Sequence, residues 1–559
     1  MRQRDDPGRS PGKDDLRRSS TAVAAGILLS RLSGLAREVI TARFLGLGAG
    51  AEAFRAALRV PNVLQNLLGE GVLSASFVPV YSQLLADGRR DDARRLAAAV
   101  VSLLFSIVSV VVALTMTFAE GVTRVLAWGF VPGTTRFELT VTLVRILAPG
   151  VGLLVLSAWC LAILNSHRRF FLSYVAPVLW NVAIVTAVAV AAITTTAETD
   201  LATAMAWGAV VGSGLQFFVQ LPVVLRLGGG LGHIGLRSVS GLDDVVRRFG
   251  QVVAGRGGIQ IASYLDLLAA SLLAFGAVSA LGYAQTLYLL PIALFGMSVA
   301  AAELPALSTI DATDADAVLA RVDAGLRRVA FFVLPTTVAF VVLGDTVVGI
   351  VFSGGRFDAD AVVQVGIVLA VYSLALPAAT ASRLLQSVLY GGGDARTPAL
   401  LSLVRVGIAL AIGVTIMLPL DAWQAGTQGI VRVDTAQLSI ASAAARAGPE
   451  NLHRIGAAGL AIGAVCGSWC ELWLLRRHLR RRIGPMPLFG SHPARQLLAA
   501  GLLAVVAVAA RIAFPQLVTE RAWGLGALAG LGVVYLVTTW LLGVSEARQL
   551  LDIKRRSSR

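Results

Sequence analysis

The sequence predicts an all-α polytopic membrane protein with about fourteen transmembrane helices. Its 559 residues are 56% hydrophobic and only 14% charged, and the mean hydropathy is +0.75. Ordinary soluble domains carry about 25% charged residues. Apolar runs close to the roughly 20 residues that a helix needs to cross a bilayer recur along the whole chain. Such a chain cannot cover itself with polar surface in water, which excludes a single soluble core.

The apolar runs define the predicted helices and their orientation. Loops on the N-terminal side of the series carry roughly thirty Lys and Arg residues and the opposite loops roughly eight, which is the positive-inside bias. The bias predicts a multi-pass membrane protein with both termini in the cytoplasm. Residues 1–20 are expected to form a disordered cytoplasmic tail and residues 546–559 a basic one. We expect helices at about 21–45, 51–86, 94–119, 139–166, 171–195, 201–226, 250–275, 279–308, 327–352, 361–390, 397–420, 455–476, 496–515 and 523–543.

Charge, cysteine and histidine usage argue against other functional classes. The net charge of +15 is spread over short loops and does not form the basic stripe of a nucleic-acid-binding protein. Cys466 and Cys470 share one helix face, but no His or carboxylate completes a metal site there. No histidine has a neighbouring nucleophile, and the two GGG segments lack the context of a phosphate-binding loop. The sequence therefore predicts no enzyme, metal or cofactor.

Prolines and glycines interrupt the second and the eighth predicted helix at matching places. Helix two has Pro61, Gly69 and Gly71, and helix eight has Pro291 and Gly296. Two matching patterns six helices apart suggest a duplicated six-helix unit, with an N-lobe at 21–226 and a C-lobe at 227–476. Parallel repeats of this kind are related by an axis along the membrane normal and hold substrate between them. The five residues are candidate gating positions. The alternative is chance, because Gly and Pro are common in membrane helices.

Ionisable side chains inside the first two predicted helices mark a candidate binding site. Each costs about 2.5–3.5 kcal/mol near the bilayer centre, so it normally faces a cavity or a partner. Arginine outnumbers carboxylate here, and its planar guanidinium binds phosphate oxygens bidentately. A cavity with excess arginine favours an anion. The alternative is that some arginines reach the membrane interface and that Arg31–Glu38 and Glu52–Arg55 are internal ion pairs. The residues are Arg31, Arg37, Glu38 and Arg43 in helix one, and Glu52, Arg55 and Arg59 in helix two.

The second half of the chain has fewer charges within its apolar runs. Asp266 in helix seven is a candidate for binding a coupling proton or cation, and an ion pair with Arg256 or Arg405 is the equal alternative. The other ionisable residues in these runs are Glu303, Arg383 and Glu471.

Six segments together resemble a known family. They read SRLSGLAREVITARFLG from Ser30, AEAFRAALRVPN from Ala51, GEGVLSASFVPVYSQ from Gly69, LGYAQTLYLLPIALFGMSVAAAELPALS from Leu281, GGGDARTP from Gly391 and GLAIGAV from Gly459. In these segments the chain resembles the MurJ/MviN family of lipid II flippases, which belongs to the multidrug/oligosaccharidyl-lipid/polysaccharide (MOP) exporter superfamily.

The resemblance implies a fold, an activity and site residues. The implied fold has two six-helix lobes around a central cavity, and two further helices within 477–545 form a groove for the polyprenyl tail. The implied activity is export of the lipid-linked peptidoglycan precursor to the outer leaflet by alternating access, driven by the membrane potential or an ion gradient, in cell-wall biogenesis. The family's essential basic positions match Arg31 and Arg37, its acidic residue early in helix two matches Glu52, and Glu70 fills the Gly-Glu-Gly position.

The sequence departs from the family pattern at two pairs of cavity positions. Gln65 and Asn66 stand where the family often has arginines, and Gln285 and Thr286 stand where Asp-Arg is usual. Arg405 also lies where a sodium site described in some members would be crowded. The residues that remain as candidate replacements for the missing cations are Arg55, Arg59 and Arg256.

The sequence leaves three hypotheses about function. The first is a lipid II flippase. The second keeps the fold but carries another polyprenyl-linked oligosaccharide or exports drugs; an exporter of cationic drugs should show excess carboxylate, not arginine. The third is a non-transporting scaffold for cell-wall synthesis proteins, for which the polar loop at 421–454 offers a docking region. Expected partners are lipid II or another polyprenyl-diphosphate-linked glycan and membrane lipids, and no nucleic acid.

Overall fold

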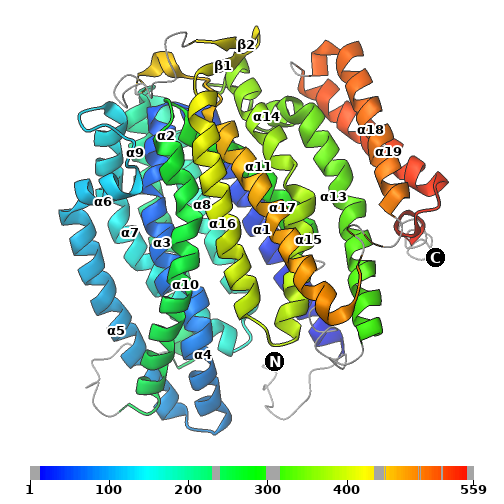
Figure 1. The fold of residues 1–559 in the computed structure, drawn as a ribbon. Coiled ribbons are helices and arrows are strands. Elements are labelled where there is room, and N and C mark those ends of the chain that lie inside the picture. Colours follow the sequence, from blue (N-terminus) through cyan, green and yellow to red (C-terminus); the bar gives the residue numbers. More distant parts are fainter. Residues whose placement is uncertain are drawn as a thin grey trace. The chain divides into compact units, whose positions relative to one another are not determined.

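A computed structural model describes residues 13–228, 239–297, 315–433, 446, 448–486, 488, 490, 493–517 and 520–549. These residues are mostly helical (Figure 1). Within each helix the backbone N–H and C=O groups of the long apolar stretches form hydrogen bonds with one another. Glu303 falls outside the described residues, and only the backbone is described at Arg256.

The first six predicted segments each contain a helix. The second is broken into three pieces, and a short helix follows the third. The helices are α1 (Lys13–Leu45), α2 (Ala49–Ala57), α3 (Arg59–Leu68), α4 (Glu70–Ala86), α5 (Arg90–Thr117), α6 (Ala119–Leu126), α7 (Thr135–Ser166), α8 (Phe170–Thr194) and α9 (Glu198–Arg226).

Each of the remaining eight predicted segments contains a helix, and residues 298–308 of the eighth lie outside the described part of the chain. A two-stranded antiparallel sheet, β1 (Trp423–Gly426) and β2 (Gly429–Arg432), pairs Trp423 with Arg432. Short 3-10 turns occupy Pro449–Asn451 and Pro515–Leu517. The helices are α10 (Leu242–Ser271), α11 (Ala277–Pro291), the π-helical η2 (Ile292–Met297), α13 (Ala315–Phe352), α14 (Ala359–Ser373), α15 (Leu376–Gly391), α16 (Arg396–Leu420), α17 (Gly456–Ile483), α18 (Pro493–Ala513) and α19 (Arg521–Leu541).

Length and apolarity mark most of these helices as membrane spans. Across the described part of the chain, 11 helices qualify, or 12 when α14 and α15, bent by 43°, are taken as one span. The two predicted spans outside this set are α1 and α10, and both carry several ionisable residues within their apolar stretches. The prediction of an all-α multi-pass membrane protein is confirmed.

The chain forms two compact units. Unit 1 comprises Met1–Thr41, Ala56–Val125 and Phe137–Ile261, and unit 2 comprises Ala42–Arg55, Leu126–Arg136 and Ala262–Arg559. The end of α1, the start of the second span and the segment before α7 therefore pack with the C-terminal half. Most of α10 packs with the N-terminal half. The lobe boundary at 226/227 stays a prediction.

Unit 1 has its core where α4, α5 and α7 meet. Phe77, Leu96 and Leu104 pack there around Trp159, and all four side chains are buried. The Trp159 indole N–H donates to the Ala97 carbonyl over 3.1 Å, so the largest core side chain leaves no polar group unsatisfied.

In unit 2, α16 and α17 approach closely along a row of glycines. A Cβ at Gly463 would lie 2.1 Å from the Ala409 carbonyl oxygen, and Cβ atoms at Gly459 and Gly467 would also meet the backbone of α16 within 2.5 Å. Small residues at such intervals let membrane helices pack backbone to backbone. The GLAIGAV segment is therefore a packing ridge.

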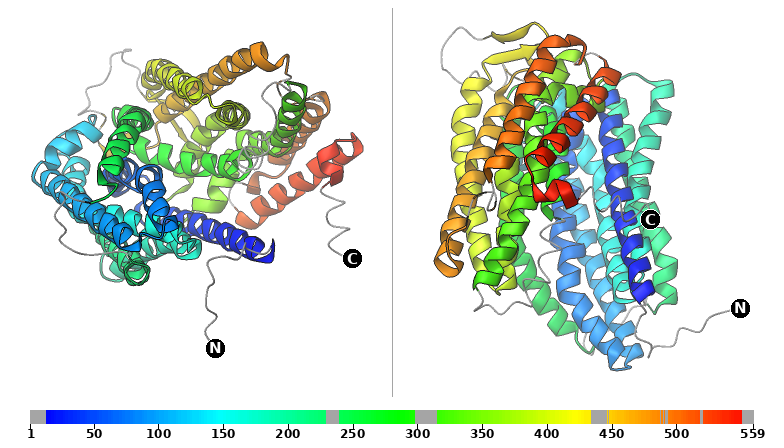
Figure 2. Two further views of the ribbon diagram at one scale, coloured as in Figure 1. Left: turned by 90° about the horizontal axis from the view of Figure 1, so that it is seen from below. Right: turned by 90° about the vertical axis from the view of Figure 1, so that its right-hand side faces the viewer.

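The C-terminal helices of unit 2 pack on α13. Leu531 and Tyr535 of α19 and Leu503 of α18 form a core with Phe331 and Leu343 of α13. Figure 2 shows α18 and α19 side by side at the end of the colour range.

Two of the predicted interruptions coincide with irregular points in the helices, whereas Pro61 lies within α3 and Gly71 within α4. Gly69 ends α3 with an extended backbone (φ −96°, ψ −144°) and α4 begins at the next residue. Pro291 ends α11, and the π-helical turn that contains Gly296 follows it. Such turns inside helices are frequent at functional sites.

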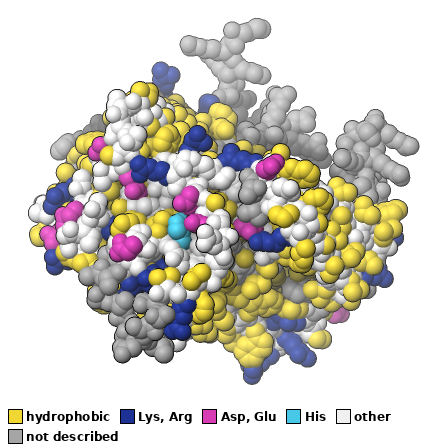
Figure 3. Space-filling model, turned by 90° about the horizontal axis from the view of Figure 1, so that it is seen from above, with side chains coloured by type: hydrophobic (Ala, Val, Ile, Leu, Met, Phe, Trp, Pro, Cys, Tyr) yellow, Lys and Arg dark blue, Asp and Glu magenta, His cyan; other side chains and the backbone are white. Residues whose placement is uncertain are grey.

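Polar contacts fix one end of unit 2. The Asp360 carboxylate accepts from the Thr427 N–H over 2.8 Å and from its hydroxyl over 3.0 Å, which ties the hairpin to the start of α14. Figure 3, seen from above Figure 1, shows acidic, basic and histidine side chains mixed on this side.

Candidate functional site

Arg37 is the centre of a polar cluster inside unit 1. Its guanidinium donates to the Glu38 carboxylate over 2.7 Å and to the Asn181 side-chain oxygen over 3.2 Å. The same guanidinium lies 5.0 Å from the centre of the Trp180 ring. Asn181 in turn donates to Ser33 of α1 over 2.9 Å. A charge that would be costly in the membrane thus has a carboxylate, an amide and an aromatic face around it.

The remaining predicted residues of unit 1 differ in exposure. Arg31 is exposed on α1, six residues before Arg37, and Arg59 is half-buried at the start of α3. Glu70 is exposed in the first turn of α4, directly after the break at Gly69. The Arg37 side chain keeps 18% of its surface accessible. The predicted site residues of unit 1 therefore combine accessible guanidinium groups with the accessible carboxylate of Glu70.

Glu52 forms a buried ion pair within unit 2. One carboxylate oxygen lies 3.1 Å from the Arg136 Nη1, and the other accepts the Val278 N–H at the start of α11 over 3.1 Å. The side chains of Glu52 and Arg136 are 0% and 2% exposed. Arg136 also lies 4.5 Å from the Phe130 ring centre. This geometry gives Glu52 a structural role, and a contact with substrate stays a prediction.

Arg55 packs on an aromatic face in unit 2. Its guanidinium carbon lies 4.0 Å from the Tyr283 ring centre, and the Tyr283 hydroxyl donates to the Gly46 carbonyl over 3.1 Å. Gly282 makes this stacking possible, because a Cβ there would lie 2.5 Å from the Arg55 Nη1. The aromatic ring stabilises the cation without neutralising it.

The two positions that depart from the family pattern on α11 make neutral hydrogen bonds. The Gln285 amide donates to the Tyr372 hydroxyl over 3.0 Å, and the Thr286 hydroxyl donates to the Gly282 carbonyl of its own helix over 2.9 Å. Gln65 is half-buried, and its carbonyl accepts from Gly69 where α3 ends.

The charges of the second half have partners that the sequence did not identify. Arg405 lies 3.5 Å from Glu471, which also accepts from Gln386 over 3.0 Å and from Ser402 over 2.8 Å. Asp266 is half-buried and lies close enough to the Tyr372 hydroxyl to interact electrostatically. The ion-coupling role of Asp266 stays a prediction.

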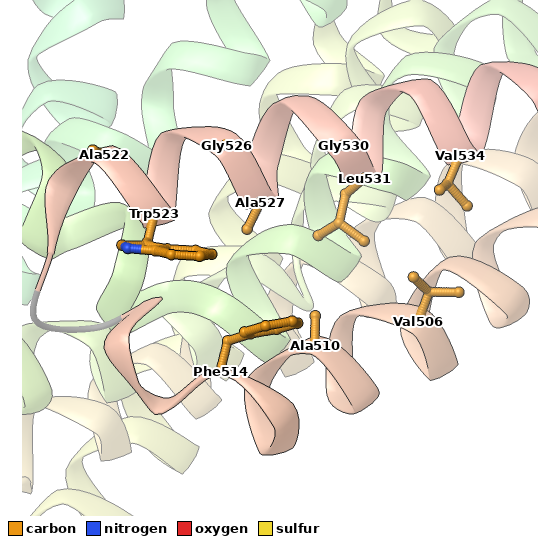
Figure 4. A pocket seen from close by; sticks show the side chains of 10 residues that line it. All are labelled: Val506, Ala510, Phe514, Ala522, Trp523, Gly526, Ala527, Gly530, Leu531 and Val534. Carbon is orange, nitrogen blue, oxygen red and sulfur yellow. The ribbon is translucent and has the colours of Figure 1, made fainter.

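An apolar groove runs between α18 and α19 and encloses about 520 Å³ (Figure 4). Phe514 and Trp523 stack at one end, with ring centres 5.9 Å apart. Added Cβ atoms at Gly526 and Gly530 would meet nothing within 4 Å, so these glycines leave the groove open. The other lining residues are Val506, Ala510, Ala522, Ala527, Leu531 and Val534.

Metal ligands do not converge anywhere in the portion of the chain that the structure describes: no group of three or more His, Cys, Asp or Glu side chains forms there.

Sequence reasoning missed Arg136 and Asn181. Arg136 directly precedes a long apolar run, and no local signal in the sequence links it to Glu52, 84 residues earlier. Asn181 lies in the middle of an apolar span, and that isolated polar residue was a usable signal.

Comparison with known proteins identifies the family. The family model described as lipid II flippase MurJ matches residues 41–427, more than half of the chain. The chain belongs to this family. A lipid II flippase MurJ of Burkholderia cenocepacia is 31% identical over 414 residues, which cover 73% of this chain and 78% of that protein. A probable lipid II flippase MurJ of Rhizobium meliloti is 30% identical over 418 residues, 73% of this chain and 77% of that protein.

Solved structures share the fold. A lipid II flippase MurJ in an inward closed conformation superposes with a TM-score of 0.72 at 18% identity and covers 95% of this chain and 99% of that one. An inward-facing multidrug resistance MATE family transporter of the MOP superfamily gives a TM-score of 0.60 at 13% identity, with 83% and 98% covered. The predicted resemblance to the MurJ family is confirmed, and the structural likeness supports the fold alone.

Proposed function

We propose that this protein is a lipid II flippase that moves the lipid-linked peptidoglycan precursor from the cytoplasmic to the outer leaflet. The observation that carries the proposal is the match to the MurJ family over residues 41–427, with relatives about 30% identical over most of both chains. The surplus of guanidinium groups in the first spans gives this assignment a physical basis, because the cargo carries a diphosphate.

The diphosphate is bound by arginines of the first three helices and is helped by one from α10. Arg37 is held in orientation by Glu38 and Asn181, so its remaining N–H groups are available to an anion at little entropic cost. Arg31 is exposed and provides the first contact. The remaining proposed contacts are Arg55, Arg59, Glu70 and Arg256, with Glu52 acting by holding Arg136.

Transport proceeds by alternating access, with the two predicted lobes rocking about the interrupted second and eighth spans. Pro61, Gly69 and Gly71 act in the second span, and Pro291 and Gly296 act in the eighth. An inside-negative potential favours outward movement of an anionic headgroup by about 2.3 kcal/mol per charge per 100 mV. Asp266 is the candidate for coupling to a proton or cation.

The groove of α18 and α19 takes the polyprenyl tail. Its lining is apolar throughout, and the glycines Gly526 and Gly530 leave space along its length, which suits a long flexible hydrocarbon chain. The positive-inside bias supports the inner membrane as the location, with both termini in the cytoplasm.

A flipping assay tests the proposal. Cells that depend on this protein are scored for lipid II exposed on the outer leaflet, with Arg37→Ala and Arg31→Ala variants at normal expression. We expect loss of exposed lipid II. The matched control is Arg124→Ala, an exposed arginine of unit 1 paired with Glu120, which should leave transport unchanged. Wild-type transport in both test variants would refute the site.

A second experiment tests whether a protein of this fold carries a different lipid-linked glycan. Reconstituted protein is offered lipid II and another polyprenyl-diphosphate glycan in parallel. Preferential movement of the second glycan would identify that glycan, and not lipid II, as the cargo. No movement of either would favour the hypothesis of a non-transporting scaffold.

A further inference from the structure

Arginines lie around a buried tyrosine and a half-buried histidine at one end of unit 1. Tyr81 of α4 and His167, which follows α7, form a hydrogen bond of 3.1 Å, and their rings meet edge to face at 5.9 Å. The Tyr81 side chain is 1% exposed. This pair lies where α4 turns into α5 and where α7 turns into α8, at the lower end of these helices in Figure 1.

Three arginines from two separate turns act on this pair. Arg90 and Arg169 lie near the imidazole, and Arg94 lies near the Tyr81 hydroxyl. Burial lowers the pKa of His167, and repulsion by Arg169 and Arg90 lowers that pKa further. The imidazole is therefore neutral at neutral pH. The positive charge at this place comes from the guanidinium groups.

Among the described residues these three cations form no ion pair, whereas two other arginines of unit 1 do. Arg89 pairs with Asp92 over 2.8 Å, and Arg247 pairs with Asp244 over 2.7 Å. Across the described residues of unit 1, no carboxylate lies within 4.0 Å of the three guanidinium groups around the Tyr81–His167 pair. The local field thus favours an anion.

The α7–α8 turn, which carries Arg169, has an unusual backbone. Arg168 adopts the left-handed conformation with φ of 58°. This conformation costs a residue with a side chain roughly 1 kcal/mol, and glycine or asparagine usually occupies it. An arginine here is unfavourable for the turn alone, which points to a function for the basic turn.

The surroundings of the arginines suit a lipid. Phe171, two residues after Arg169, is 61% exposed, and Val182 and Val190 continue an exposed apolar surface along α8. A cluster of cationic residues near the start of a helix with exposed aromatic and aliphatic side chains is typical of the membrane interface, where headgroup meets acyl chain.

We propose that Arg90, Arg94 and Arg169 form a binding site for the phosphodiester headgroup of an anionic membrane lipid, with Phe171 against its acyl chains. The guanidinium groups bind the phosphate oxygens bidentately. When the Tyr81 hydroxyl donates to Nε2 of His167, Nδ1–H is left as a further donor. The site differs from the residues proposed for cargo, and its ligand is a resident lipid that is not transported.

Lipid binding to the purified full-length protein tests the site. Native mass spectrometry measures the Kd of dioctanoyl phosphatidylglycerol, with dioctanoyl phosphatidylcholine and inorganic phosphate as comparison ligands. The combined variant R90Q/R94Q/R169Q should raise the Kd for phosphatidylglycerol by roughly tenfold or more, since the loss of even one charge-assisted contact weakens binding by about a factor of ten. The control R124Q should leave it unchanged. All three arginines are exposed, so the fold should tolerate the change.

A second variant separates the contribution of the acyl chains to binding from that of the headgroup. Phe171→Ser leaves the arginines intact. It should weaken phosphatidylglycerol binding by roughly threefold or more without changing the binding of inorganic phosphate. Unchanged phosphatidylglycerol binding in the triple variant, or equal loss in R124Q, overturns the site. Equal affinity for inorganic phosphate and phosphatidylglycerol, or tight phosphatidylcholine binding, overturns the assignment to an anionic lipid.

Discussion

Removal of Arg136 should destabilise unit 2 strongly, because it leaves a buried carboxylate without its counter-ion. In Arg136→Met the methionine keeps the apolar contact with Phe130, while Glu52, at 0% exposure, loses the guanidinium 3.1 Å away. Breaking a buried pair by removing one partner costs about 3–5 kcal/mol. We expect a loss of that size in the free energy of unfolding.

The double variant should recover much of this loss. Glu52→Gln combined with Arg136→Met removes both charges, and the glutamine oxygen can still accept the Val278 N–H. We expect the two substitutions to be non-additive by roughly 2 kcal/mol or more, because replacing both members of a buried pair is often close to neutral.

Reversible unfolding in mixed micelles, followed by tryptophan fluorescence, measures both quantities. Arg124→Met, which breaks an exposed pair with Glu120, is the control and should change stability by less than about 1 kcal/mol. A loss below 1 kcal/mol in Arg136→Met, or additive effects of the two substitutions, would refute a buried, mutually dependent ion pair.

Three further predictions concern unit 2. Burial raises the pKa of Asp421 to about 6, against the opposing effect of nearby arginines, so the folded state binds this proton more tightly than the unfolded state. The resulting stabilisation of about 2–3 kcal/mol should be fully present below pH 4 and lost as the pH rises through 6. Asp421→Asn should abolish this pH dependence of the free energy of unfolding, measured between pH 4 and 7.5. Gly530→Leu should fill the α18–α19 groove and reduce crosslinking to a photoreactive polyprenyl phosphate severalfold. Gly532→Leu, outside the groove, should not reduce it. Equal crosslinking in both variants would exclude the groove as the binding site of the polyprenyl tail. Gly463→Ala should cost about 1–3 kcal/mol of unfolding free energy because its Cβ meets the α16 backbone, while Gly501→Ala, with open space, should be neutral or stabilising.

The sequence alone determined the class of fold and most helix positions. Each predicted segment contains a helix because long apolar runs in lipid must satisfy their own backbone groups, and only a helix does so within one segment. The breaks at Gly69 and Pro291 were also predictable, since glycine weakens a helix and proline removes a backbone donor locally. The family followed from short motifs in the printed sequence.

Only the tertiary structure decided which charges meet. Local spacing suggested Arg31–Glu38 and Glu52–Arg55 as ion pairs, whereas the structure pairs Arg37 with Glu38 and Arg136 with Glu52. Helical periodicity gives the direction of a side chain on its own helix. The partner across a gap depends on how other helices are rotated and packed, and that is set by contacts between residues far apart in the chain.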